Sequence, residues 1–240
     1  RRFFLYLPLT QLHFPTLPNR DFEGRTGAGD FADSMVEMDH RVGQLLDAVD
    51  ELGIAQDTLF VFASDNGPEF RRPWRGTAGP WTGTYHTAME GGLRVPLIVR
   101  WPGRVAPGVV SDDIVHVTDL YTTLAAAAGA ALPSDRPIDG VNQLPWWTGQ
   151  VEHSAREAFV FYIKTELRAV KWRHWKMHLV FESEPNQGTR HLETPWLFNL
   201  KRDPKEETDV AMEEGWVRGP IRRLILAFEQ SLREHKPIPP

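Results

Sequence analysis

Two oxygen-bearing side chains follow directly after an apolar run that has the length of a strand. Asp65 and Asn66 lie in Ser64-Asp65-Asn66-Gly67, immediately after Leu59–Ala63. A carboxylate beside an amide carbonyl offers oxygen ligands, which Ca²⁺ and Mg²⁺ prefer, whereas zinc recruits histidine or cysteine. Ligands of α/β sheets collect beyond the carboxyl ends of strands, so the position suits a metal site. The same residues also fit a plain tight turn, since Asn-Gly is a strong turn signal.

A histidine lies in a proline-rich loop near the start of the chain. His13 precedes Phe14 and Pro15, and the prolines restrict the loop that carries the imidazole. Such a histidine can contact an anionic substrate or protonate a leaving group. A surface histidine without a chemical role is the alternative interpretation.

A loop rich in glycine and aromatic residues covers residues 74–86. Within it, Arg75 and His86 can donate hydrogen bonds to a sulfate or phosphate, and the glycines let backbone N–H groups approach an oxyanion. Glycine and tryptophan also collect in ordinary packed loops. The composition alone therefore does not distinguish a pocket wall from packing.

Helices and strands alternate around these residues, which predicts an α/β class. Apolar residues recur at three- and four-residue steps from Asp30 to Leu52, so a helix is expected there, with Asp30 as its N-cap and Gly53 as its stop. The continuous apolar run Leu59–Ala63 suits a parallel strand covered on both faces. The remaining expected elements are a short buried strand at Phe3–Leu7, a strand at Leu97–Trp101 and a helix at Thr118–Ala128 that ends at Gly129.

The sequence pattern changes near residues 145–155. Short segments separated by charged turns follow, at 158–163, 168–172, 176–181 and 196–200, before an amphipathic helix around 220–234. This pattern predicts a small antiparallel sheet with one helix. We therefore expect an α/β part over residues 1–150 and a small C-terminal subdomain over residues 151–240.

Composition and charge limit the partners of the protein. The 240 residues carry a net charge of −5, so no basic excess favours nucleic acid or anionic lipid. No apolar run approaches the roughly 20 residues that span a bilayer, so no membrane partner is expected. The absence of cysteine excludes disulfides and thiolate metal sites within these residues.

Several charged groups are expected to lie at the surface. They are Glu37, Asp39, Asp47, Asp50 and Glu51 of the predicted helix, and the charged turn Lys201–Asp209. The basic residues Lys171, Arg173 and Lys176 could be mistaken for a nucleic-acid platform. Alternation along strands explains them more simply.

Taken in order, these segments resemble the formylglycine-dependent sulfatases, especially bacterial arylsulfatases. The matching segments are His13–Pro15, Gly29–Asp33, Glu37–Asp39, Leu52–Ile54, Ser64–Pro68, Glu90–Pro96, Arg100–Gly103, Ala169–Trp172 and Leu197–Leu200. The resemblance covers nearly the full length. It implies an alkaline-phosphatase-like α/β domain, present here in part, followed by a small four-stranded antiparallel domain with a C-terminal helix. It also implies hydrolysis of a sulfate ester, from a small molecule or a glycan.

The resemblance also assigns roles to particular residues. In that family the Asp-Asn pair after this strand binds Ca²⁺, so Asp65 and Asn66 are expected to be calcium ligands, with Mg²⁺ less favoured. The histidine of the family's His-x-Pro loop lies at the sulfate, which gives His13 a substrate-contacting or leaving-group role. The ion would polarise the sulfate oxygens and offset negative charge as it develops. A bacterial cytoplasmic or periplasmic location is compatible with the resemblance.

The sequence departs from the family's pattern in two respects. The family's formylglycine is made from a Cys/Ser-x-Pro/Ala-x-Arg motif, and neither this motif nor the further Asp ligands of the calcium site occur here. We therefore expect the chain to be a C-terminal portion, inactive alone, that needs the N-terminal half of the same protein.

The second departure concerns the sulfate-binding lysine that many members carry five residues before Glu-Gly-Gly. Here Tyr85 occupies that position, and the neighbouring His86 is the candidate substitute. A phosphodiesterase or phosphonate hydrolase on the same fold is one alternative function. A non-catalytic module that packs against a partner is another.

Overall fold

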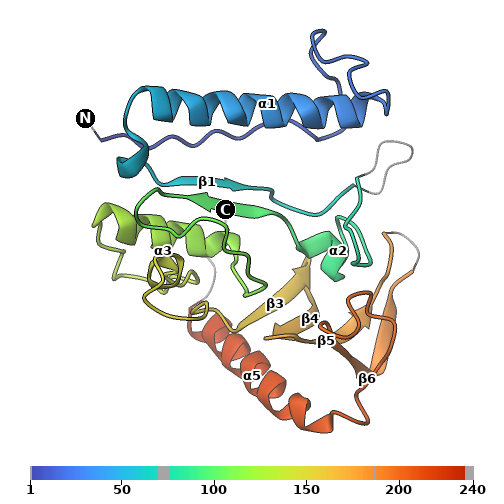
Figure 1. Cartoon of the computed structure of the whole chain (residues 1–240). Coiled ribbons are helices and arrows are strands. Elements are labelled where there is room, and N and C mark those ends of the chain that lie inside the picture. Colours follow the sequence, from blue (N-terminus) through green and yellow to red (C-terminus); the bar gives the residue numbers. More distant parts are fainter. Residues whose placement is uncertain (1, 70–75, 186–187, 236–240) are drawn as a thin grey trace.

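The structure is a computed structural model that describes residues 2–69, 76–185 and 188–235 (Figure 1). The first elements are α1 (Asp30–Glu51), the 3₁₀ turn η1 (Ala55–Asp57), β1 (Phe60–Ala63), α2 (Glu90–Leu93), β2 (Leu97–Arg100), α3 (Val117–Ala128) and α4 (Leu144–Trp147). They are followed by β3 (Ala158–Ile163), β4 (Glu166–Trp172), β5 (Trp175–Phe181), β6 (Arg190–Asn199), the 3₁₀ turn η2 (Gly215–Val217) and α5 (Arg218–Glu234). Among the residues that the structure describes, none of the helices combines the length and the apolar character of a membrane span.

Strands β1 and β2 form a two-stranded ribbon, with α1 on one side of it and α3 on the other (Figure 1). The two strands are antiparallel, with Phe60 opposite Arg100 and Ala63 opposite Leu97. The prediction of a parallel strand is therefore wrong for the pairing that the described residues make. An apolar run indicates burial but does not determine strand direction, which depends here on how the connection from Ser64 to Pro96 returns.

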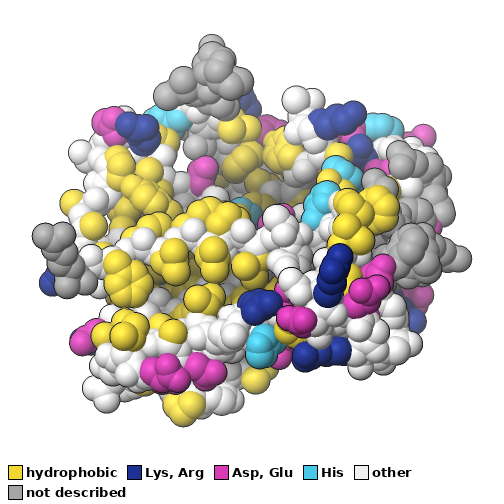
Figure 2. Space-filling view, turned by 90° about the horizontal axis from the view of Figure 1, so that it is seen from above, with side chains coloured by type: hydrophobic (Ala, Val, Ile, Leu, Met, Phe, Trp, Pro, Cys, Tyr) yellow, Lys and Arg dark blue, Asp and Glu magenta, His cyan; other side chains and the backbone are white. Residues whose placement is uncertain are grey.

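The N-terminal segment is exposed and belongs to no strand. Phe3, Phe4, Leu5, Tyr6 and Leu7 are between 50% and 79% exposed. The prediction of a short buried strand there is wrong, because a strand also needs a pairing partner and the described residues provide none. The segment runs alongside α1 in Figure 1, and Figure 2 shows hydrophobic side chains gathered over the face seen from above.

The ends of α1 and α3 are determined by different residues. The residue that precedes α1 is Gly29, whose φ of 93° lies in the left-handed region, so Asp30 is not the N-cap that the sequence predicted. Helix α3 is preceded by His116, which forms a capping box with Asp119. It ends at Gly129, which adopts φ 71° as predicted for a glycine stop.

Two acidic residues of α1 face inward. Asp33 is 1% exposed and accepts a 2.8 Å hydrogen bond from the Gly24 backbone N–H. Glu37 accepts a 2.7 Å bond from the Asn19 backbone N–H. Because Glu37 is buried, the prediction that it faces solvent is wrong. Both carboxylates tie the preceding loop to the first two turns of the helix.

The C-terminal sheet has the order β3-β4-β5-β6, and each neighbouring pair is antiparallel. Helix α5 packs on it, and the shared core is formed by Val170, Trp175, Met177, Leu197, Ala211, Val217 and Ile221. The predicted antiparallel sheet with one helix is therefore confirmed. The apolar residues alternate along the strands, so one face of the sheet is covered by the helix.

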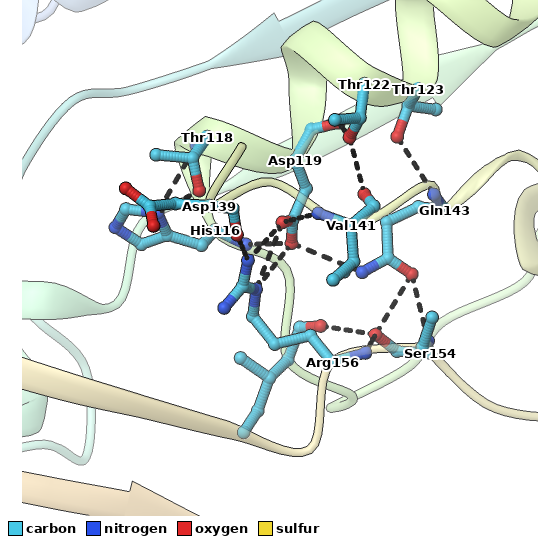
Figure 3. Close-up of polar contacts among 12 residues, drawn as sticks. His116, Thr118, Asp119, Thr122, Thr123, Asp139, Val141, Gln143, Ser154 and Arg156 are labelled. Carbon is cyan, nitrogen blue, oxygen red and sulfur yellow. Dashed lines mark hydrogen bonds and ion pairs between the residues drawn. The ribbon is translucent and has the colours of Figure 1, made fainter. Parts of the chain in front are cut away.

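A buried polar network connects α3 to the start of the C-terminal sheet (Figure 3). Asp119, which is fully buried, accepts bonds from Arg156 Nη2 at 2.6 Å and Nε at 2.8 Å. It also accepts bonds from the backbone N–H of His116 and of Val141, both at 2.9 Å, and from Gln143 Nε2 at 3.2 Å. A single carboxylate therefore links α3, the connection after it and the segment that leads into β3.

Candidate functional site

Asp65 and Asn66 lie directly beyond the carboxyl end of β1, in the position that the sequence predicted. Asp65 is exposed and its Oδ1 accepts a 2.9 Å bond from the Asn66 backbone N–H. The Asn66 side-chain N–H donates to the Gly67 carbonyl at 2.9 Å, which orients the amide oxygen to the opposite side. The segment therefore has the hydrogen bonds of a turn and also presents a carboxylate and an amide oxygen.

Backbone contacts between glycines fix this turn against the start of α2. The Gly67 N–H donates to the Gly92 carbonyl at 3.0 Å. A Cβ atom on Gly67 would lie only 2.0 Å from the Gly91 carbonyl oxygen. A Cβ on Gly91 would lie 2.5 Å from the Gly83 carbonyl oxygen, and one on Gly92 would lie 2.2 Å from that of Thr84. Only glycine permits this close approach, so three chain segments pack backbone to backbone.

His86 belongs to the same group of loops. The Tyr85 N–H donates to the Pro68 carbonyl at 2.9 Å, which joins the His86 loop to the Asp-Asn turn. His86 is exposed, has φ 71° and packs its ring against that of Tyr85, with 3.7 Å between centroids. A left-handed backbone costs a residue other than glycine about 1–2 kcal/mol, so the surrounding bonds must hold it. Because the imidazole is exposed, it can accept or donate a hydrogen bond.

His13 lies next to the residue that follows the Asp-Asn turn. Its Nε2 is 3.7 Å from a carboxylate oxygen of Glu69. Its Nδ1 is 2.6 Å from the Phe14 carbonyl, which accepts the Nδ1 hydrogen and leaves Nε2 directed at Glu69. Glu69 was not among the residues predicted from the sequence. Its position three residues after Asn66 is the sequence feature that could have indicated a place near the site.

The remaining predicted substrate-binding residue, Arg75, lies outside the described residues. The described ranges contain no group of three or more His, Cys, Asp and Glu residues that could hold a metal ion. Asp65 and Asn66 provide only oxygen donors, which suits a hard cation. Since Ca²⁺ takes roughly six to eight oxygens, a calcium site at this pair would need further ligands.

A buried ionic cluster that the sequence pattern did not predict surrounds Glu90, the first residue of α2. Glu90 accepts bonds from Lys171 Nζ at 2.7 Å, from Lys176 Nζ at 3.1 Å and from Arg94 Nε at 2.9 Å. Burial acts to raise the pKa of the Glu90 carboxyl, but the lysines and Arg94 together hold it far below its usual range. Glu90 is therefore a buried anion in an electropositive setting.

A second carboxylate, Glu206, completes the cluster. Glu206 Oε1 accepts a 2.7 Å bond from the Glu90 backbone N–H, and its other oxygen lies 3.3 Å from Lys176 Nζ and 2.5 Å from His178 Nε2. Burial lowers the pKa of His178, and the contact with Glu206 only partly opposes this effect. The prediction that residues 201–209 are a surface turn is therefore wrong for Glu206, which is 3% exposed.

One signal could have revealed this cluster. Lys171 and Lys176 lie directly opposite each other on β4 and β5, and both are buried. Like charges at opposed positions of antiparallel strands are destabilising unless an anion lies between them. Two opposed lysines in this hairpin therefore predict a buried carboxylate from another segment.

The sequence matches two protein-family models. Residues 1–130 match the family described as "Sulfatase", and residues 154–238 match the "C-terminal region of aryl-sulfatase". Among curated relatives, mouse steryl-sulfatase is 34% identical over 98% of this chain and 42% of its own length. Human arylsulfatase A is 34% identical over 96% of this chain and 48% of its own length. The chain thus spans less than half the length of these relatives.

Solved structures give the same result for the fold. The PsFucS1 sulfatase from Pseudoalteromonas sp. superposes with a TM-score of 0.89 at 28% identity, over 95% of this chain and 48% of that chain. The phosphonate monoester hydrolase of Agrobacterium radiobacter has a TM-score of 0.56 at 21% identity, over 84% of this chain and 41% of that one, and is similar in fold alone. The fold is the alkaline-phosphatase-like α/β fold in part, followed by a C-terminal antiparallel sheet and helix. With residues 1–130 matching the sulfatase model and this fold, the chain belongs to the sulfatase family.

Proposed function

We propose that the complete protein is a sulfuric ester hydrolase and that this chain provides one side of its active site. The observation that supports this best is the meeting of three distant segments beyond the end of β1. His13 reaches Glu69, the Asp65-Asn66 turn packs on α2, and the His86 loop bonds to Pro68. Acidic, amide and imidazole groups therefore lie on neighbouring loops, which supports a site for hydrolysis of a charged ester.

Asp65 and Asn66 would hold a calcium ion, with Mg²⁺ less favoured because it demands a tighter octahedral shell. When bound, the ion supplies positive charge that offsets the charge on the sulfate oxygens. His86 can donate a hydrogen bond to one of these oxygens. His13 keeps its Nδ1 hydrogen on the Phe14 carbonyl, so it can donate a proton from Nε2 to the leaving-group oxygen only as the doubly protonated imidazolium.

The nucleophile and the remaining ligands would come from the rest of the protein. A formylglycine is expected there, since the motif from which it is made does not occur in these residues. The exposed hydrophobic residues of the N-terminal segment, with Met35 and Val36 of α1, offer a surface of the kind that another part of the protein covers. We propose that the other half of the same protein packs there.

The substrate is proposed to be a sulfate ester of a small molecule or a glycan. The relatives include steryl-sulfatase and N-acetylgalactosamine-6-sulfatase of mouse, whose names refer to a small molecule and to a sugar. A phosphodiester or phosphonate remains the second candidate, because the fold is shared with a phosphonate monoester hydrolase. Rates on matched aryl sulfate and aryl phosphate esters separate the two, and a preference for the phosphate contradicts the first proposal.

The assignment of Asp65 is tested in the full-length protein with Asp65→Asn. This change keeps the shape but removes the charge, and a calcium site that loses one anionic ligand is expected to bind at least about tenfold more weakly. Isothermal titration with Ca²⁺ and hydrolysis of an aryl sulfate are the measurements. Asp57→Asn, at an exposed position just before β1, is the matched control. Calcium affinity equal to that of the control contradicts the assignment.

A further inference from the structure

We infer that Glu90 is a positioning residue, through which the C-terminal sheet holds the Asp65-Asn66 turn and the His86 loop in their working geometry. The inference rests on the proposed function, because the site that Glu90 would position is the one proposed above. Neither Glu90 nor its partners lie among the groups proposed to touch the metal or substrate. Their effect would reach the site through the backbone.

The first step is the attachment of Glu90 to the sheet. Both carboxylate oxygens are held by lysines, Oε2 by Lys171 on β4 and Oε1 by Lys176 on β5. The backbone N–H of the same residue is held by Glu206. The start of α2 is therefore fixed through its side chain and through its main chain. All four residues are buried, so these charged bonds are little screened by solvent.

The second step runs from α2 to the proposed metal ligands. Gly91 and Gly92 follow Glu90 directly, and Gly67 packs on them with no side chain between the two backbones. Protein interiors at this density transmit displacements rather than absorb them. A shift of α2 must therefore move Gly67, which is bonded to the neighbouring Asn66 through its carbonyl.

The third step runs from α2 to the imidazole. The Gly91 N–H donates to the Thr82 carbonyl at 2.7 Å, and the Gly92 backbone lies against that of Thr84. These contacts hold the loop on which His86 adopts its left-handed backbone. The same few residues of α2 thus hold both the Asp65-Asn66 turn and the His86 loop in place. Sites of this kind tolerate displacements of only about 0.5 Å.

The Asp119–Arg156 pair offers a matched comparison. It is also a buried ion pair that joins the first part of the chain to the C-terminal sheet. The groups bonded to Asp119, however, belong to the start of α3, the following connection and the segment before β3, and none of them is in residues 64–68 or 82–86. Loss of this pair should reduce stability without altering the site.

The experiment uses the full-length protein and the substitutions Glu90→Gln and Asp119→Asn. Calcium affinity is measured by isothermal titration, kcat and KM on an aryl sulfate, and thermal stability by calorimetry. Glu90→Gln is expected to weaken calcium binding by about 10- to 100-fold, the range found when residues that orient metal ligands are lost. Asp119→Asn is expected to lower the Tm as much or more and to leave calcium affinity within about threefold of wild type. Equal calcium losses in both variants would overturn the inference.

A double variant separates positioning from stability. Adding Lys171→Met to Glu90→Gln removes a cation that the first change leaves unpaired, so thermal stability should recover in part. The tether between α2 and β4 stays absent, so calcium affinity should stay low. Recovery of calcium affinity together with the Tm would show a purely structural role. The double variant also serves if Glu90→Gln alone does not fold.

A final measurement does not depend on calcium or on activity. Hydrogen exchange at the amides of Gly67, Tyr85 and Gly91 reports directly on the contacts that Glu90 is inferred to hold. Exchange is expected to accelerate at all three in Glu90→Gln and to match wild type in Asp119→Asn. Unchanged exchange in Glu90→Gln overturns the inference. Failure of wild-type protein to bind calcium or hydrolyse sulfate esters would instead refute the proposed function.

Discussion

Replacing the fully buried Asp119 by asparagine should destabilise the protein severely. The change preserves the size of the side chain but removes its charge and turns one acceptor into a donor. Arg156, only 11% exposed in its side chain, would then lose its carboxylate partner. At least one of the N–H groups of His116, Val141 and Gln143 that now bond to the carboxylate would face another donor.

The expected magnitude follows from burial. Removing one partner of a buried ion pair costs about 3–5 kcal/mol, because the remaining charge stays buried and uncompensated. Each hydrogen bond lost from an uncharged N–H group lowers the free energy of unfolding by about 1 kcal/mol or more, which is consistent with this range. An exposed pair of the same residue types gives the control. Asp135 and Arg136 lie 2.8 Å apart with side chains 67% and 59% exposed, so Asp135→Asn should leave the free energy of unfolding close to that of wild type.

Urea unfolding of the full-length protein and of both variants is the assay, at pH 7 and at a series of lower pH values. Burial acts to raise the pKa of Asp119, but the bonds from Arg156 and from backbone N–H groups outweigh it and lower the pKa. A lowered pKa contributes stability above the unfolded-state value of 3.8, which is lost as pH falls through the folded-state value. The difference in free energy of unfolding between wild type and Asp119→Asn should therefore become smaller below about pH 4. Equal effects of Asp119→Asn and Asp135→Asn at pH 7 would refute the reasoning.

Two further predictions concern close packing and pH. Gly67→Ala would place a methyl group 2.0 Å from the Gly91 carbonyl oxygen and should lower the free energy of unfolding by at least about 1–3 kcal/mol. Gly43→Ala, in open space on α1, is the control and should be neutral or stabilising by up to about 1 kcal/mol. Urea unfolding midpoints compare the two variants, and similar losses of stability in both would argue against the glycine contacts. Burial lowers the pKa of His178, so the unfolded state takes up its proton first and stability should fall as pH drops below about 6.5. The unfolding midpoint of His178→Gln should vary less between pH 7 and pH 5, and an unaltered slope would contradict this.

Local patterns predicted the elements whose stability depends on neighbours close in sequence. The alternating segments after residue 157 gave the four-stranded sheet, because hairpins pair consecutive strands. The three- and four-residue spacing gave α1 within one residue of its observed end. The glycine stop of α3 was also predicted, since Gly129 can adopt a positive φ without cost.

Long-range pairing was not predictable from such patterns. Phe3–Leu7 has the composition of a strand but no partner among the described residues, and β1 pairs in the opposite direction from the one expected. The cluster around Glu90 joins residues up to 116 positions apart. For the candidate site, residue types and order predicted Asp65, Asn66, His13 and His86, which the structure brings to neighbouring loops, but not the contact with Glu69.

The buried charges between α2 and the C-terminal sheet have a consequence for protein engineering. Chimeras that exchange the C-terminal sheet between related enzymes would separate Glu90 from Lys171, Lys176 and Glu206, which lie on the other side of such a junction. A donor sheet with apolar residues at those positions would leave the buried Glu90 carboxylate with Arg94 as its remaining cationic partner and without the lysines that now hold it. A chimera should therefore take Glu90, Lys171, Lys176 and Glu206 from the same parent protein.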